Sequence, residues 1–358
     1  MICRKFGVSR QTAYKFLRRY KAEGRVGLKD RSRRPRSRCG SQATQWRRRV
    51  LELRRTHPTW GSRKLRWLLG RRFGTRSCLP AERTLQRWIA AAGLRREASV
   101  QRRRVHPAAG VRASLAYRSN AIWTIDLKGW FITTNGSKIE PLTIRDLWSR
   151  FVLWARPLGS RTEAAVRRVC CRLFRRFGRP KVIRCDLGVP FFGNGPRGFT
   201  RLSLWWWRLG IRVEFVRRGL INNNAHEQMH GVMKAELGVA HTAQAQAQRL
   251  ERWRHRYNHE RPHDGLGMRV PAHCYRPQPR RLPSMQKPSY PPHWLVRRVE
   301  ENGKISLPKW RGSIGRAFGG LQVGLAPAGP RRFRIYFTSL YLGALDLNQT
   351  GKLIITRY

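Results

Sequence analysis

The chain carries a very large excess of positive charge. Lys and Arg number 76 against 19 Asp and Glu, which gives a formal net charge of +57 over 358 residues. Self-repulsion at such a charge opposes a compact state unless a polyanion offsets it, and nucleic acid is a dense polyanion. Hydrophobic residues make up 41% of the chain, too many for a disordered basic tail. We therefore expect a folded protein that binds nucleic acid; the alternative is a merely adhesive basic protein from an Arg-rich proteome.

Cysteine usage and hydropathy indicate where such a chain works. The seven cysteines are odd in number and form no C-x-x-C pair, so neither a disulfide framework nor a thiolate zinc site is expected. No apolar run reaches the roughly 20 residues of a membrane helix. Residues 1–20 are basic and lack the apolar stretch of a signal peptide. We expect a cytoplasmic protein that has no membrane partner.

Residues 1–38 are predicted to form a partial helix-turn-helix followed by a basic linker. Ser9 is a suitable N-cap, and apolar residues recur after it at helical spacing. A recognition helix that starts at Ser9 would present Arg10, Gln11 and Tyr14 to DNA. The first helix of the motif is nearly missing, since only residues 1–5 precede the Phe6-Gly7-Val8-Ser9 turn, so we expect an N-terminally shortened copy. The alternative is an ordinary helical hairpin.

A second helical DNA-binding domain is predicted for residues 39–117. One helix is capped by the segment from Thr59 to Leu65, and residues 80–88 have the pattern of a second short recognition helix closed by Gly93. Arg63 and Arg83 are the DNA contacts expected from these two helices. The basic residues 95–118 are predicted to be a loop that marks the domain boundary.

The pattern changes at residue 118 to alternating strands and helices. Such alternation is typical of a mixed sheet flanked by helices, and we predict an α/β core over residues 118–280. A Pro-rich linker follows, and short alternating segments separated by glycine then predict a small β-barrel, so that residues 281–358 form a last domain. The fold class is thus multidomain: N-terminal all-α domains, a central α/β core and a C-terminal small β-barrel.

Three acidic residues of this acid-poor chain stand where strands and helices of the predicted core meet. Asp126 interrupts an apolar strand, Asp186 follows another strand, and Glu227 lies in the first turn of a helix. Three carboxylates at one edge of a sheet form a hard oxygen site suited to Mg²⁺ or Mn²⁺. Two such ions, about 3.5–4 Å apart, can activate an attacking oxygen and stabilise a leaving oxygen in phosphodiester transfer. The alternative is that these acids are salt-bridge partners of the many arginines.

Four motifs in order resemble those of the DDE transposases of bacterial insertion sequences, whose catalytic core is of the retroviral-integrase type. The first is Trp123-Thr124-Ile125-Asp126-Leu127-Lys128-Gly129 and the second is Asp186-Leu187-Gly188-Val189-Pro190-Phe191. The third is Asn224-Ala225-His226-Glu227-Gln228-Met229-His230, leading to Lys234 and Glu236, and the fourth is Tyr257-Asn258-His259-Glu260-Arg261-Pro262-His263. The N-terminal segment also resembles the helix-turn-helix and linker of this family.

The resemblance implies a ribonuclease-H-like fold for the core and a metal-dependent enzyme. It implies that Asp126 and Asp186 bridge the metal ions, that Glu227 holds one of them, and that Lys234 contacts the transposon end; the alternative for Lys234 is a solvated surface position. Such a protein binds double-stranded DNA at transposon ends and targets, acts as a homo-oligomer on DNA, and associates with the bacterial nucleoid. The alternatives are an inactive, transposase-derived DNA-binding protein, or a nuclease with the same core that joins no strands.

One departure from the family motifs bears on activity. The second motif of the family usually reads Asp-Asn-Gly, whereas position 187 of this chain is Leu, so we expect weaker support for Asp186 from its surroundings.

Several histidines, including His226 and His230, could suggest zinc. They lack cysteines at zinc-finger spacing and several already belong to the family motifs, so no zinc site is expected.

Overall fold

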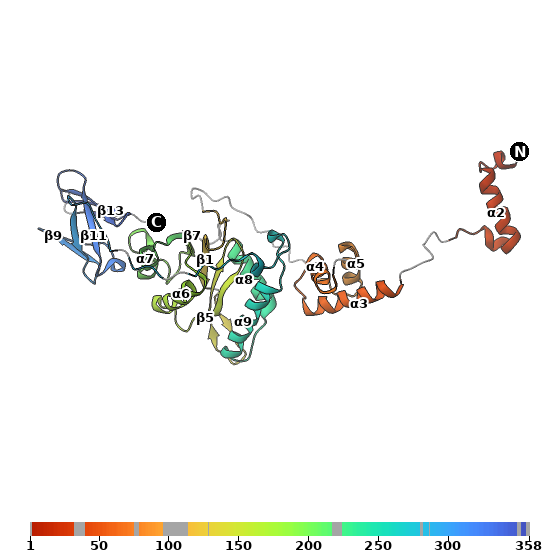
Figure 1. Cartoon of the computed structure of the whole chain (residues 1–358), viewed down its shortest axis with the longest axis horizontal. Coiled ribbons are helices and arrows are strands. Elements are labelled where there is room, and N and C mark those ends of the chain that lie inside the picture. The colour runs from red at the N-terminus through yellow and green to blue at the C-terminus, as the bar shows by residue number, and fades with distance from the viewer. Residues whose placement is uncertain are drawn as a thin grey trace.

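The computed structural model describes residues 2–31, 40–74, 79–95, 114–127, 129–216, 224–279, 282–285, 287–348 and 352–355. Figure 1 shows the units in chain order along the long axis, from the N-terminal helices to the C-terminal strands. The predicted linker after Asp30 and the predicted boundary loop at 95–118 fall mostly outside the described residues. None of the described helices is long and apolar enough to cross a membrane.

The N-terminal unit contains α1 (Ile2–Lys5), α2 (Arg10–Glu23) and the 3-10 turn η1 (Gly24–Leu28). Ser9 caps α2 as the sequence predicts, because its hydroxyl accepts a hydrogen bond from the backbone N–H of Thr12 at 3.2 Å. Gly7 supplies the turn between the helices with a φ of 61°, a value that glycine adopts without strain. The helices of this unit leave Tyr14, Leu17 and Tyr20 exposed.

The second helical unit consists of α3 (Gly40–Thr56), α4 (Ser62–Phe73) and α5 (Glu82–Ala91). Its core is formed by apolar side chains from all three helices, among them Val50, Leu65, Leu69 and Leu85, each fully buried. Helix α4 begins after Gly61, which makes no side-chain capping bond. Helices α4 and α5 pack against each other and against α3.

The central unit is built on a five-stranded mixed sheet in the order β5-β4-β1-β6-β7. Strands β1 (Ile122–Leu127), β6 (Val182–Asp186) and β7 (Arg212–Val216) run parallel to one another. Strand β4 (Pro141–Asp146) pairs antiparallel with β1, and β5 (Val152–Pro157) pairs antiparallel with β4 at the edge of the sheet. A separate short hairpin joins β2 (Phe131–Ile132) and β3 (Lys138–Ile139).

Helices cover both faces of this sheet, as the alternating pattern predicts. Helices α6 (Glu163–Phe177) and α7 (Arg201–Arg208) share a core with Trp123 and Ile125 of β1. Helices α8 (Asn224–Leu237) and α9 (Ala243–His259) share another with Val152 and Ala155 of β5. Because side chains alternate along a strand, Thr124 and Asp126 point away from the α6–α7 core and toward α8. The short elements η2 (Pro196–Gly198), η4 (Asp264–Leu266) and α10 (Pro271–Cys274) complete the unit.

The C-terminal unit corrects one prediction, because its described strands do not close into a barrel. Its main sheet is open, in the order β14-β13-β12-β11-β8, with β14 and β8 at the two edges. The bounds are β8 Leu295–Arg298, β9 Lys304–Leu307, β10 Trp310–Ser313, η5 Arg316–Phe318, β11 Gln322–Pro327, β12 Arg332–Phe337, β13 Leu340–Asp346 and β14 Lys352–Ile355. Strands β9 and β10 form a separate hairpin that shares a core with the open sheet, through Ile305, Phe318 and Leu325. The sheet buries its apolar face against this hairpin and η5, so closure on itself is not required.

Candidate active site on the α8 face of the core

Asp126 and Asp186 lie at the same level of two adjacent parallel strands. In the β1–β6 ladder Thr124 pairs with Arg184, and each aspartate lies two residues farther along its strand. Both aspartates therefore lie just beyond the last paired residues of β1 and β6, on the same face of the sheet. Asp186 is buried, and the Asp126 side chain is 20% exposed. Burial, and then the negative charges of Asp186 and Asp126, hold the pKa of Cys185 well above its usual value.

Helix α8 is held on this same face by two histidines that flank Glu227 in sequence. His226 Nδ1 lies 2.6 Å from the hydroxyl of Thr124 on β1, and its Nε2 lies 2.7 Å from the hydroxyl of Thr143 on β4. His230 Nε2 lies 2.8 Å from the same Thr143 hydroxyl. These bonds hold the first two turns of α8 against β1 and β4, and Glu227 lies half-buried in the first of these turns.

His226 and His230 also place possible metal-ligand atoms near Asp126, although no histidine metal site was expected from the sequence. Among the described residues, Asp126, His226 and His230 each offer a possible metal-ligand atom, and these atoms lie within 4.8 Å of one another. His230 Nδ1 lies 3.7 Å from Asp126 Oδ2, and the two histidine rings are nearly perpendicular. Burial, followed by the charges of His230 and Arg145, lowers the pKa of His226 well below its usual value, so His226 is neutral. The signal in the sequence was their spacing of four residues, which places them on one helix face.

Leu187, the departure from the family motif, has a packing role. Its side chain packs against the main hydrophobic core beside the strand end that carries Asp186. The residue after Asp186 is thus oriented into the protein interior. Gly188 lies close to the carboxylate, since a Cβ at this position would be 3.2 Å from both oxygens of Asp186.

The predicted DNA contacts are distributed over three units. Arg10, Gln11 and Tyr14 are exposed on α2, whereas the Ser9 hydroxyl is used as the helix cap. Arg83 is exposed on α5. Lys234 is exposed on α8, two turns beyond Glu227. Arg63 is exposed as well, but its guanidinium pairs with Asp264 of the core at 3.3 Å.

That pair belongs to a contact between the second helical unit and the core. Lys64 also approaches Asp264, at 3.7 Å, and the Thr59 hydroxyl donates to Glu236 Oε1 at 2.6 Å. Glu236 in turn pairs with Arg261, whose guanidinium lies over the ring of Trp60 at 5.8 Å. The contact joins the loop before α4 to the far end of α8, the helix that carries Glu227.

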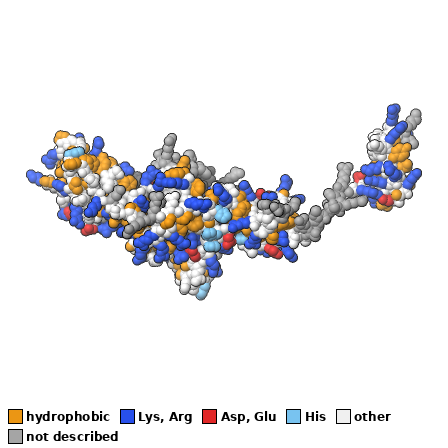
Figure 2. Space-filling view, viewed as in Figure 1, with side chains coloured by type: hydrophobic (Ala, Val, Ile, Leu, Met, Phe, Trp, Pro, Cys, Tyr) orange, Lys and Arg blue, Asp and Glu red, His pale blue; other side chains and the backbone are white. Residues whose placement is uncertain are grey.

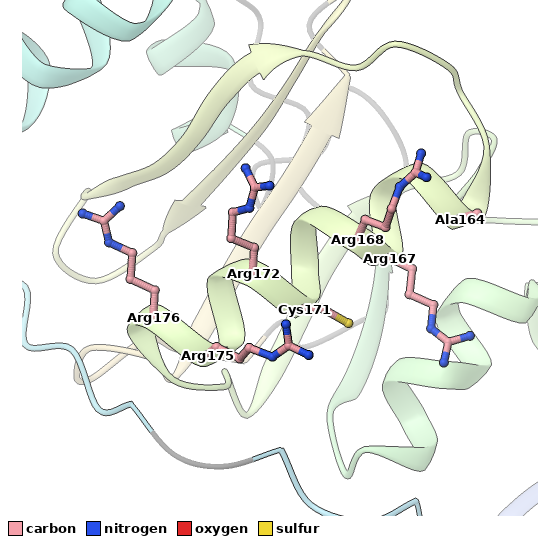
Figure 3. Close-up of a pocket in the computed structure, with 7 residues that line it drawn as sticks. All are labelled: Ala164, Arg167, Arg168, Cys171, Arg172, Arg175 and Arg176. Carbon is pink, nitrogen blue, oxygen red and sulfur yellow. The ribbon is translucent and has the colours of Figure 1, made fainter.

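Cationic side chains cover the molecule well beyond the carboxylates. In Figure 2 Lys and Arg side chains appear over the core and the helical and C-terminal units, while acidic ones are few. Helix α6 alone carries a groove lined by five exposed arginines (Figure 3): Arg167, Arg168, Arg172, Arg175 and Arg176. This helix packs on the face of the sheet opposite α8. Cationic surface is therefore present on both sides of the core.

Comparison with known proteins gives matches to the N-terminal unit and to the central core. The helix-turn-helix domain family matches residues 2–36, and the integrase core domain family matches residues 209–271, a range that contains Glu227 and Lys234. A protein of insertion element IS407 from Burkholderia multivorans, described as an uncharacterized 31.7 kDa protein, is 26% identical over 231 residues. That alignment covers 63% of this chain and 78% of the relative.

Solved structures that resemble the chain include two of retroviral origin. One is the HTLV-2 integrase catalytic core domain in complex with magnesium, in its trimeric form, with a TM-score of 0.34 and 13% identity. The match covers 44% of this chain and 98% of the integrase domain. The other is the simian T-cell lymphotropic virus intasome in complex with the PP2A regulatory subunit B56 gamma, with a TM-score of 0.34 and 13% identity. The match covers 82% of this chain and 97% of the intasome chain.

The two domain matches and the insertion-element relative identify the class of protein. A helix-turn-helix domain, an integrase core domain and similarity to an insertion-element protein together support an insertion-sequence transposase with an integrase-type core.

Proposed function

We propose that this protein is a DDE-type DNA transposase that cuts and joins DNA with divalent ions, Mg²⁺ or Mn²⁺, held by Asp126, Asp186 and Glu227. The observation that carries the proposal is the position of Asp126 and Asp186 at the same level of adjacent parallel strands, on the face that α8 covers. Strand ends of this kind, where a sheet meets a helix, are common sites for ligands in α/β proteins.

The residues present fit such ions. Carboxylate oxygens are the ligands that Mg²⁺ and Mn²⁺ prefer, and the burial of Asp186 beside a half-buried Asp126 disfavours two bare negative charges there. Bound ions would activate the attacking oxygen and stabilise the leaving oxygen of the phosphodiester. Asp126 is held by its pairing with Thr143 of β4, Asp186 by its pairing with Val216 of β7, and Glu227 lies on α8.

DNA would be held by the exposed basic side chains of several units. Arg10, Gln11 and Tyr14 on α2 are placed to contact base edges and thereby select the transposon end, with the helix fixed by Ser9. Arg63, Arg83 and Lys234 are placed to contact phosphates, which position the duplex without reading its sequence. For Arg63 this requires exchange of Asp264 for a phosphate. Pairing of two transposon ends requires an oligomer on the DNA, and we place this activity in the bacterial cytoplasm, at the nucleoid.

The test compares Asp126→Asn with Asp346→Asn, a matched change at the end of a strand in the C-terminal unit. Each protein is given a labelled duplex that carries the end of its element, with Mg²⁺ or Mn²⁺, and binding is titrated in parallel. Asp126→Asn should lose strand cleavage and joining by orders of magnitude and still bind the duplex, because the substitution removes the ligand charge and keeps the shape. Asp346→Asn should retain both.

Each alternative predicts a different pattern in this assay. Wild-type protein that binds ends and never cleaves with either ion would be an inactive, transposase-derived DNA-binding protein. Wild-type protein that cleaves and never joins would be a nuclease. Equal cleavage by wild type and Asp126→Asn would refute the assignment of the three acids.

A further inference from the structure

The hydroxyl of Thr143 connects Asp126 to both histidines of α8. Thr143 Oγ1 lies 3.0 Å from the backbone oxygen of Asp126, 2.7 Å from His226 Nε2 and 2.8 Å from His230 Nε2. A hydroxyl has one proton to donate, and a carbonyl oxygen can only accept. The Thr143 proton is therefore directed to Asp126, and both Nε2 atoms act as donors to Thr143.

This pattern fixes which nitrogen of each ring carries the proton. A neutral imidazole has one N–H and one lone pair, so a proton on Nε2 leaves the lone pair on Nδ1. For His226 that lone pair accepts the proton of the Thr124 hydroxyl at 2.6 Å, a much shorter contact than the 3.5 Å from this hydroxyl to the backbone oxygen of Arg145. Both nitrogens of His226 are thus used in positioning α8 on the sheet, and His226 is a positioning residue.

His230 differs from His226 because its Nδ1 faces a carboxylate. The lone pair of Nδ1 and the carboxylate oxygen Oδ2 of Asp126 are two acceptors 3.7 Å apart. Two ligand atoms that share one ion, each about 2.1 Å from it, lie roughly 3.0–3.6 Å apart as the angle between them widens from 90° to 120°. The observed separation needs only a small ring rotation to reach this range.

We propose that His230 Nδ1 is an additional ligand of the ion held by Asp126, so that the site is a mixed oxygen and nitrogen site. This proposal rests on the proposed function, since it concerns the same ion. Mg²⁺ favours oxygen ligands, whereas imidazole raises the affinity for later divalent metals. The nitrogen ligand therefore shifts the preference of the site from Mg²⁺ toward Mn²⁺ and Co²⁺.

The test measures Mn²⁺ binding to the full chain without DNA, using calorimetry and pulsed electron paramagnetic resonance. Wild-type protein should show ¹⁴N coupling to bound Mn²⁺. His230→Ala should lose that coupling and bind Mn²⁺ at least about tenfold more weakly, a loss that even a supporting residue of a metal site commonly causes. His241→Gln, which changes an exposed histidine outside the site, should leave both unchanged. Melting temperatures show whether each variant is folded.

A second variant covers the case in which His230→Ala does not fold. Thr143→Val removes the hydroxyl that orients the ring, so the ¹⁴N coupling should weaken and Mn²⁺ affinity should fall, while Asp126 and His230 both remain. Unchanged coupling and affinity in Thr143→Val would contradict the proposed orientation of His230.

Asp126→Asn separates failure of this proposal from failure of the proposed function. If Mn²⁺ binding depends on Asp126 but shows no ¹⁴N coupling, or if the coupling persists in His230→Ala, ligation by His230 is refuted and the carboxylate site stands. If Mn²⁺ does not bind, or binds equally to Asp126→Asn, the carboxylate site and the His230 ligand both fail.

Discussion

Glu236 offers a sharp test of the contact between α8, α9 and the second helical unit. Its Oε1 accepts from the Thr59 hydroxyl and from Arg261, and its Oε2 accepts from the indole N–H of Trp253 at 3.0 Å. Exposed fractions are 15% for the Glu236 side chain and 6% for that of Arg261. Truncation to alanine therefore leaves a buried guanidinium without its carboxylate.

The expected cost of Glu236→Ala follows from that burial. Breaking a buried ion pair by removing one partner typically costs about 3–5 kcal/mol. A domain of 150–250 residues loses roughly 2–4 °C of melting temperature per kcal/mol, so the variant should melt on the order of 10 °C lower. Substituting both Glu236 and Arg261 by methionine should recover much of this loss, because an apolar pair of similar volume is often as stable as a buried ion pair, within about 1–4 kcal/mol.

Glu251 on α9 is the matched control. It also binds arginines, Arg254 and Arg156, but Glu251 is 33% exposed and these arginine side chains are 18% and 48% exposed, more than Glu236 and Arg261. Exposed pairs contribute about 0–1 kcal/mol, so Glu251→Ala should melt close to wild type. Thermal and urea unfolding, followed by circular dichroism, measure all four proteins. If Glu236→Ala costs no more than Glu251→Ala, the reasoning from burial is wrong.

Two further predictions concern salt and pH. Replacing Arg168, Arg172 and Arg175 of α6 by glutamine should lower the salt dependence of duplex binding by roughly 2.7 in log–log slope, about 0.9 per phosphate contact; an unchanged slope would mean that α6 does not contact DNA. Burial, and then the charges of Arg261 and Arg150, lower the pKa of His263 to about 2. The folded state therefore keeps His263 neutral while the unfolded state binds a proton below about pH 6.5, so stability is full above that pH and falls by up to about 1.4 kcal/mol per unit below it. His263→Gln should remove this component from urea unfolding curves between pH 7 and 5, and equal slopes in the two proteins would contradict it.

The strands that carry the aspartates could be predicted from the sequence because each is a short, largely apolar run with an acid within it or directly after it. Alternation along β1 places Trp123 and Ile125 in the core and Asp126 on the opposite face. The cap of α2 was equally local, since Ser9 acts on a backbone N–H three residues away. Features set by neighbouring residues of the chain are the ones that a single sequence specifies.

The open form of the C-terminal sheet could not be predicted from the sequence. Alternation and glycine spacing predict strands correctly, but they do not determine whether the first and last strands of a sheet meet. In this chain β8 and β14 remain at opposite edges, and the β9–β10 hairpin covers the apolar face instead. Likewise, nothing local to residue 59 or residue 236 indicates that Thr59 donates to Glu236, because the two are 177 positions apart.

Several acids of the chain pair with arginines and Asp126 faces a histidine, so the alternative that the acids are salt-bridge partners has to be judged acid by acid. Glu140, Glu214 and Glu236 each pair with an arginine, so that alternative is correct for them. Asp126 faces His230. The ionic role of an acid in an Arg-rich chain is thus decided by which elements surround it, and composition alone does not distinguish the two cases.

The orientation of His230 depends on three elements at once. Its spacing of four residues from His226 is visible in the sequence and indicates a shared helix face, but it does not say which nitrogen carries a proton. That is decided by the Thr143 hydroxyl on β4, and Thr143 is directed in turn by the backbone oxygen of Asp126 on β1. The histidine pair could therefore be set aside as an incomplete zinc motif when judged by residue types alone. Once the three elements are assembled, one histidine secures the helix to the sheet and the other directs a lone pair at a carboxylate of the proposed metal site.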